Sequence, residues 1–164
     1  MDKKKKLKIL YITSLLAMVV SIFLIYQHYN PEESKFCNFG ESFSCDIVNK
    51  GEYSTIDGEI NLIMSMLFGG YYFIYLPIPN SIISFFIFLF ITGGIIKLYK
   101  NKTYFGMKGE KIFKIIKILL VLSLIYALFL VYIEAAIIKS WCIFCLALDT
   151  LILIMVVTIF SMRR

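Results

Sequence analysis

The stretch Ser140-Trp141-Cys142-Ile143-Phe144-Cys145 opens an apolar run that continues to Met162, and it holds two cysteines at Cys-x-x-Cys spacing. A helix that continues from Cys142 places Cys142, Cys145 and Asp149 on one stripe, at i, i+3 and i+7. Two thiols and an acid are therefore expected to share a face at the boundary of an apolar segment. Further out along the chain, Cys37 and Cys45 form a second pair, which we expect on the same side of a membrane.

The composition is typical of a membrane protein, with 60% hydrophobic and 17% charged residues. A soluble domain has roughly 45–50% apolar and about 25% charged residues. A bilayer crossing needs about 20 mostly apolar residues. The chain has uncharged runs at 9–27, 60–96, 118–133 and 150–162. The sequence therefore predicts one all-α membrane domain over residues 1–164, built as a bundle of four transmembrane helices.

The net charge of +6 is distributed unevenly. Basic residues gather in the N-terminal tail, in the stretch 97–117 and at the C-terminus, whereas seven of the eleven acids lie between Glu32 and Glu59. An excess of Lys and Arg marks cytoplasmic loops. The basic charge thus indicates topology and not a nucleic-acid partner. It predicts cytoplasmic termini and cysteines on the extracytoplasmic or lumenal side.

The first apolar run is predicted to be an uncleaved crossing, because no small-x-small cleavage site follows it. Four crossings then satisfy the charge rule, with an outer loop at 28–77 and a basic inner loop at 97–117. The crossings lie at about 9–27, 78–96, 115–138 and 141–162. Only Lys139 and Ser140 separate the last two, which predicts a tight hairpin on the outer side.

The run 60–96 is long enough for two crossings, but two would place the Lys-rich inner loop outside. Pro77 and Pro79 divide the run, and proline is accepted in the first turn of a helix. We therefore predict a helix over 60–75 that lies on the outer surface. A kinked or re-entrant second crossing is the alternative. Residues near the end of the predicted helix suit the headgroup level: Gly69, Gly70, Tyr71, Tyr72 and Tyr75.

All four cysteines are predicted on the side where disulfides form and persist. Two pairs of this kind favour a relay, in which a thiolate attacks a disulfide and a mixed disulfide forms. The loop pair, Cys37 and Cys45, can meet both a soluble partner and a fixed pair. Cys142 is expected in the first turn of its helix, where free N–H groups and the helix dipole favour a thiolate. Cys145 lies one turn deeper, within reach of a quinone dissolved in the membrane.

Structural roles for the cysteines are the main alternative. Cys37–Cys45 can be a plain stabilising disulfide, and Cys142 and Cys145 can be buried small hydrophobes, which would make the chain a non-enzymatic membrane scaffold. Four cysteines can also bind zinc, but an oxidising compartment and the lipid-side position of Cys145 argue against a metal site. Another class of disulfide-forming membrane protein carries its Cys-x-x-Cys in the first outer loop. Here the Cys-x-x-Cys comes last and begins a helix.

Two acids lie within apolar runs, and acids inside a membrane are functional candidates. Asp149 can relay the proton that is released when a thiol reduces a quinone, or hydrogen-bond a quinone oxygen. It can equally pair with another polar group for packing. Glu134 lies near the outer end of its crossing, so we expect it to reach toward water or to pair with Lys139. His28, the only histidine, is expected to be an interfacial residue.

These residues are similar to those of the vitamin K epoxide reductase family, including its bacterial and archaeal homologues that oxidise thiols for disulfide formation. The resemblance extends from the first crossing to the fourth. It rests on Cys37 and Cys45 with seven residues between them, and on Ser44 directly before the second. It also rests on Cys142-Ile143-Phe144-Cys145 and on Ile78-Pro79-Asn80-Ser81-Ile82, which is similar to the family's entry into its second crossing.

The resemblance implies a four-helix bundle around a quinone, with the outer loop and its surface helix as a lid. It implies that Cys37 exchanges electrons with a thioredoxin-like partner and that Cys45 exchanges with Cys142. Cys145 would exchange electrons with the quinone, and Asn80 would hydrogen-bond a quinone oxygen.

Three features depart from the family pattern. Gly51 stands where a serine is common, and Asp149 stands where animal members carry a tyrosine that contacts the substrate. The segment between the loop and the second crossing is also longer than expected. The change at Asp149 bears on recognition of an epoxide.

The sequence thus predicts a membrane thiol–quinone oxidoreductase that supports disulfide formation, quinone reduction or quinone epoxide reduction. The acceptor would be a quinone of the vitamin K, menaquinone or ubiquinone type. The membrane would be a cell membrane or that of the endoplasmic reticulum.

Overall fold

The computed structural model describes residues 3–32, 37, 38, 40, 42–69, 75–100, 106 and 108–162. Within these residues, four helical stretches are long and apolar enough to cross a membrane. They are Lys4–Tyr29, Asn80–Tyr99, Gly109–Ile138 and Ile143–Phe160. The prediction of an all-α membrane bundle of four helices is confirmed.

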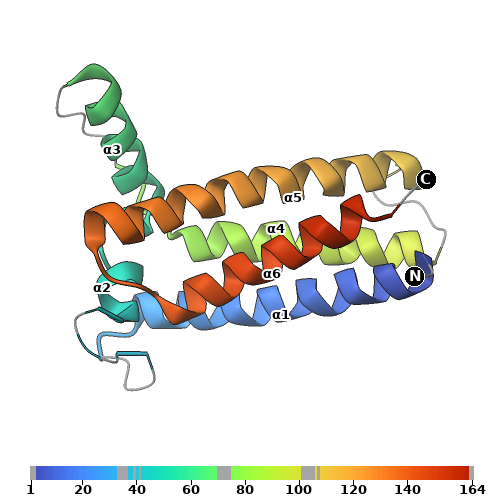
Figure 1. Ribbon diagram of the computed structural model, residues 1–164, viewed down its shortest axis with the longest axis horizontal. Helices are drawn as coiled ribbons and strands as arrows, with labels where there is room; N and C mark the ends of the chain where they lie inside the picture. Colours follow the sequence, from blue (N-terminus) through green and yellow to red (C-terminus); the bar gives the residue numbers. More distant parts are fainter. Residues whose placement is uncertain are drawn as a thin grey trace.

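The four long helices lie side by side along one axis (Figure 1). They are α1 (Lys3–Tyr29), α4 (Asn80–Tyr99), α5 (Gly109–Tyr132) and α6 (Ile143–Phe160). Helix α1 packs against α4 and α6, and α5 packs against α6 and α4. Both chain termini lie at one end of the bundle, and the short helices α2 (Cys45–Asn49) and α3 (Ile56–Phe68) lie at the other.

Each long helix contributes a completely buried side chain to the centre of the bundle: Ala17, Ile91, Leu120 and Met155. Large apolar side chains on the outside remain exposed, among them Val19, Leu128 and Val157. Exposed apolar surface on this scale is unusual for a soluble protein, but it is what a bundle presents to lipid tails. The pattern fits an integral membrane protein.

Basic residues contact the chain near the termini. The Lys6 ammonium donates a hydrogen bond to the carbonyl of Ser161. The Lys117 ammonium lies 3.9 Å from the ring centroid of Phe160, within the range of a cation–π contact. These contacts gather positive charge at the end of the bundle opposite α2 and α3. A cytoplasmic location for this end stays a prediction from the charge rule.

The helix boundaries between the outer loop and the second crossing differ from the sequence prediction. The helix expected over 60–75 is α3, which runs from Ile56 to Phe68 and ends at Gly69 in a left-handed conformation, with φ 67°. The second crossing begins at Asn80, and Pro79 directly precedes it in an extended conformation. The residues Gly70, Tyr71 and Tyr72 lie outside the described part of the chain.

The hairpin between the third and fourth crossings is wider than a two-residue turn. Helix α5 continues as a π-helix, η2 (Ile133–Ile138), and Lys139 follows in a left-handed conformation with φ 57°. Helix α6 then begins at Ile143 and not at 141. A π-helix is rare and is frequently found at functional sites. Here it sets the position of Glu134.

Candidate functional site

The first residues of α6 determine where the Cys142 sulfur points. Cys142 was predicted in the first helical turn, but it directly precedes the helix in an extended conformation. Its sulfur accepts a hydrogen bond from the backbone N–H of Cys145 at 3.2 Å, so the thiol caps the helix end. The Cys142 side chain therefore lies at the N-terminal end of α6 as a cap residue and not inside the first turn.

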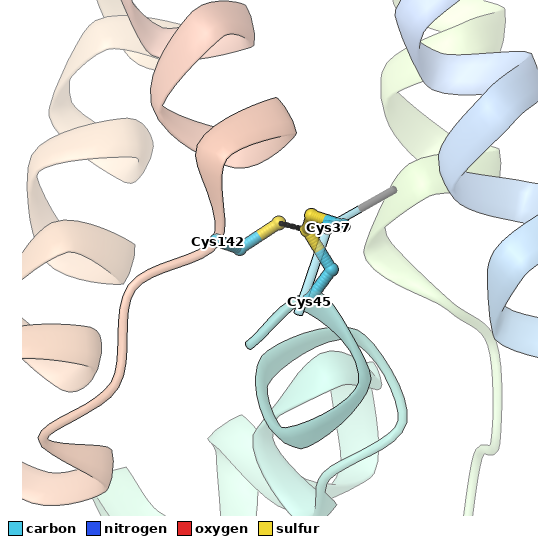
Figure 2. Close-up of side chains that lie close together, drawn as sticks. All are labelled: Cys37, Cys45 and Cys142. Carbon is cyan, nitrogen blue, oxygen red and sulfur yellow. Dashed lines mark hydrogen bonds between the residues drawn. A yellow bond between two sulfur atoms is a disulfide. The ribbon is translucent and has the colours of Figure 1, made fainter. Parts of the chain in front are cut away.

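The loop pair lies directly against this residue. Cys37 and Cys45 form a disulfide, with their Cα atoms 5.5 Å apart, and both are buried. The Cys142 thiol donates a hydrogen bond to the Cys45 sulfur at 3.3 Å (Figure 2). Three sulfur atoms from two distant parts of the chain therefore meet in a buried cluster. Of the two disulfide sulfurs, that of Cys45 is the one hydrogen-bonded to the α6 thiol.

Backbone hydrogen bonds hold the loop in this position. The N–H of Ser44 donates to the carbonyl of Trp141 at 3.1 Å, and the N–H of Trp141 donates to the carbonyl of Ser42 at 3.0 Å. Ser44 and Trp141 each directly precede a cysteine, and Ser42 lies three positions before Cys45. Together they fix the register of the loop against the start of α6 and align Cys45 with Cys142.

Helix α2 carries the loop and is tied to the end of α1. The Asn49 amide donates to the carbonyl of Leu24 at 2.7 Å, and the His28 imidazole contacts the Asn49 carbonyl at 2.5 Å. His28, expected to be an interfacial residue, thus supports the loop. At the other end of α2, the Ser44 hydroxyl accepts the N–H of Ile47 as an N-cap.

Gly51 follows α2 at a position where the family pattern favours serine. A side-chain carbon added there would lie 2.6 Å from the carbonyl oxygen of Ile47. A serine would therefore require the backbone to shift in this chain.

Glu134 is not at the water boundary, and the expectation that it reaches toward water or pairs with Lys139 is wrong. Its side chain is buried, and its carboxylate accepts a hydrogen bond from the backbone N–H of Cys142 at 3.2 Å. The π-helix places Glu134 at the turn before α6, whereas Lys139 is exposed. An acid in a buried position needs such a partner. Glu134 therefore belongs to the cysteine site.

A cavity of about 70 Å³ lies between the helix ends beside the cysteine cluster. Three predicted site residues line it: Cys145, Asn80 and Asp149. Cys145 and Asp149 thus share a face of α6 as predicted, whereas the Cys142 sulfur is hydrogen-bonded to Cys45. Apolar side chains make up much of the remaining wall, including Leu24, Leu130 and Leu148, and Glu134 also contributes. The cavity thus combines one thiol, two acids, two amides and three serines with apolar walls.

Glu59 is the residue that sequence analysis missed. It lies on α3, is buried, and accepts hydrogen bonds from Asn80 Nδ2 at 2.5 Å and from the Tyr126 hydroxyl at 2.6 Å. Burial raises the pKa of Glu59 from 4.5 to about 6, while the bonds from Tyr126 and Asn80 act in the opposite direction. In the sequence, Glu59 is one of seven acids in a polar segment. Nothing local distinguishes it from a solvated carboxylate.

A metal site was not predicted, yet the sulfur atoms of Cys37, Cys45 and Cys142 all lie within 4.8 Å of one another. Metal ions bind thiolates, and two of these sulfurs are joined as a disulfide. The arrangement in this oxidation state is therefore suited to thiol–disulfide exchange. Cys142 and Cys145 are both free thiols.

Comparison with known proteins gives one family. The sequence pattern of the Vitamin K epoxide reductase family matches residues 8–160, nearly the whole chain. No curated protein matches the chain significantly.

Proposed function

Because the chain belongs to the vitamin K epoxide reductase family, a family of membrane oxidoreductases that act on thiols, disulfides and quinones, we propose that its four cysteines carry electrons from a thioredoxin-like partner to a membrane quinone. The observation that carries the proposal is the 3.3 Å contact between the Cys142 thiol and the Cys45 sulfur of a disulfide. It supports direct exchange between the loop pair, Cys37 and Cys45, and the inner pair, Cys142 and Cys145.

The proposed relay begins at the loop pair. A dithiol of the partner reduces the Cys37–Cys45 disulfide and is itself oxidised to a disulfide. The Cys45 thiolate then attacks the sulfur of Cys142 in an oxidised Cys142–Cys145 pair, and Cys145 leaves as a thiolate. Cys37 resolves the mixed disulfide by attacking Cys45, which restores the loop disulfide and leaves Cys142 reduced. Two electrons have then moved from the loop to the inner pair.

The second half of the relay takes place at the cavity. Cys142 and Cys145 form a disulfide, and their two electrons and two protons convert a quinone into a hydroquinone. Cys145 lines the cavity and Cys142 does not, which supports Cys145 as the residue that meets the quinone. Asp149 and Glu134, which also line the cavity, are proposed to hold or pass the protons. A loop disulfide beside two free thiols is the state between the two halves.

The topology supports the same assignment. The cysteines lie at the end of the bundle opposite the termini and the basic residues near them (Figure 1). By the charge rule, that end is proposed to face the extracytoplasmic or lumenal side, where a thioredoxin-like partner in an oxidising compartment is accessible. Asn80 and Asp149, which line the cavity, are proposed to form part of the site that holds the quinone and its reduced form.

The test uses the purified full-length protein in detergent, with a reduced thioredoxin-like protein as donor and menadione as acceptor. We expect the intact chain to reduce the quinone and Cys145→Ala to lose the activity. Thr150→Ala, an exposed position on the same helix, serves as the matched control and should retain it. An active Cys145→Ala protein would refute the relay. An intact chain inactive with naphthoquinone and benzoquinone acceptors would favour a structural role for the inner pair.

A further inference from the structure

Helix α3 protrudes from the bundle (Figure 1), and its last turn exposes large apolar side chains such as Leu67 and Phe68. The first turn of α3, in contrast, packs closely against the rest of the protein. Gly58 approaches η1 (Glu52–Ser54) so closely that a side-chain carbon would lie 1.6 Å from the Glu52 carbonyl oxygen. The next residue, Glu59, is only 4% exposed. The Glu59 carboxylate is therefore buried against the bundle, although α3 protrudes from it.

This carboxylate joins three helices. One oxygen accepts from Asn80 at the start of α4, and the other accepts from the Tyr126 hydroxyl on α5. The Tyr126 bond, at 2.6 Å, is in the range of a charge-assisted O–H···O⁻ hydrogen bond, and the Asn80 nitrogen lies 2.5 Å from the other oxygen. Such a contact determines the orientation of the groups that donate to it.

The consequence for Asn80 follows from its chemistry. A side-chain amide has one oxygen that accepts and one nitrogen that donates two hydrogen bonds. A carboxylate can face only the nitrogen, because it would repel the oxygen. The second N–H of Asn80 is directed at the Tyr53 carbonyl, at the longer distance of 3.4 Å. Both donors of the amide are therefore engaged, and the atom left for a ligand is the oxygen.

The Asn80 oxygen also lies at the cavity without a partner among the described residues. Asn80 lines the cavity beside Cys145, and Asn80 Oδ1 is buried without a hydrogen-bond partner in the described part of the chain. A buried acceptor without a partner costs stability unless a ligand supplies a donor. A quinone has carbonyl oxygens and no donor, whereas a hydroquinone has two hydroxyl groups. An acceptor at this position matches the reduced form.

We propose that Glu59 is a positioning residue that holds the Asn80 amide so that its oxygen accepts a hydrogen bond from the hydroxyl of a hydroquinone. The inference rests on the proposed quinone function and deepens it, because it assigns the preferred redox form of the ligand. Binding the product form more tightly favours transfer of electrons from the thiols to the quinone within the site. Helix α3 thereby influences the quinone site without contacting the ligand.

The experiment measures binding of menadione and of its hydroquinone, under anaerobic conditions, in full-length protein with Cys145→Ser. This change prevents electron transfer, and quenching of Trp141, the only tryptophan, reports binding. Glu59→Leu releases the amide, so it should weaken hydroquinone binding relative to quinone binding by about tenfold, the effect of losing one hydrogen bond of ordinary strength. Glu59→Gln keeps an acceptor for Asn80 and should restore most of the preference.

Tyr126→Phe is the matched control, because it removes the other bond of Glu59 and leaves the Asn80 contact in place. The proposal requires that it leave the preference unchanged; an equal shift would mean that the seating of α3 is responsible. An unchanged preference in Glu59→Leu overturns the proposal. If Glu59→Leu does not fold, Asn80→Ala decides: it must weaken hydroquinone binding and spare quinone binding. If neither form binds the Cys145→Ser protein, the quinone site itself is wrong.

Discussion

Replacing Glu134 with alanine is the most direct test of how the protein aligns its two cysteine pairs. The carboxylate accepts the backbone N–H of Cys142 at 3.2 Å, and both groups are buried. Without the carboxylate, the N–H of Cys142 loses its acceptor. Cys142, whose sulfur contacts Cys45, is then held by one hydrogen bond fewer. Glu134→Gln keeps an oxygen at the same position and should have a smaller effect.

The magnitude follows from the cost of an unpaired buried donor, about 1–3 kcal/mol. If this cost appears as lost alignment between Cys142 and Cys45, the rate of exchange between the pairs falls by roughly 5- to 150-fold, at 1.4 kcal/mol per factor of ten. The Cys37–Cys45 disulfide itself should still form, because its two cysteines lie on the other side of the contact.

The assay starts from protein whose Cys142–Cys145 pair has been oxidised by quinone. A reduced dithiol is added, the reaction is quenched with acid at timed intervals, and alkylation with mass spectrometry gives the oxidation state of each pair. Glu110→Ala is the control, since it removes an exposed acid from the first turn of the same helix. Exchange at the wild-type rate in Glu134→Ala, or equal slowing in Glu110→Ala, would refute the reasoning.

Two further predictions concern the loop pair and Glu59 on α3. After quinone has oxidised the Cys142–Cys145 pair, Cys37→Ala should trap a Cys45–Cys142 disulfide: the Cys45 thiolate attacks Cys142, Cys145 leaves as a thiolate, and no Cys37 remains to resolve the product. The two sulfurs are 3.3 Å apart and must close only to about 2.05 Å. Peptide mapping without reductant should find this cross-link, and a predominant Cys142–Cys145 disulfide would contradict the prediction. The second follows from the raised pKa of Glu59, about 6 against 4.5, which means that the folded protein binds this proton more tightly than the unfolded chain. The free energy of unfolding should therefore fall by up to about 2 kcal/mol as pH rises from about 4.5 to above 6. Thermal unfolding at several pH values measures this, and Glu59→Gln should remove the dependence. Equal pH profiles for the two proteins would count against the prediction.

The sequence was sufficient for the membrane bundle because the relevant information is local. Apolar runs of crossing length and the position of lysines decide which segments span, without reference to any partner. The spacing within Cys142-x-x-Cys145 is equally local, so the inner pair and its link to Asp149 were predictable. The family resemblance added the expected role of Asn80.

Tertiary structure alone decided how these groups face one another. Glu134 was expected near water because its position suggested the end of a helix, but a π-helix carries it to Cys142. Glu59 and Tyr126 are 67 positions apart, and Cys45 and Cys142 are 97 apart. The hydrogen bond that a buried polar group makes depends on which helices pack beside it, and no local pattern encodes that choice. The sequence by itself therefore determined the membrane fold and the four cysteines, and packing determined which sulfurs meet and how the acids are used.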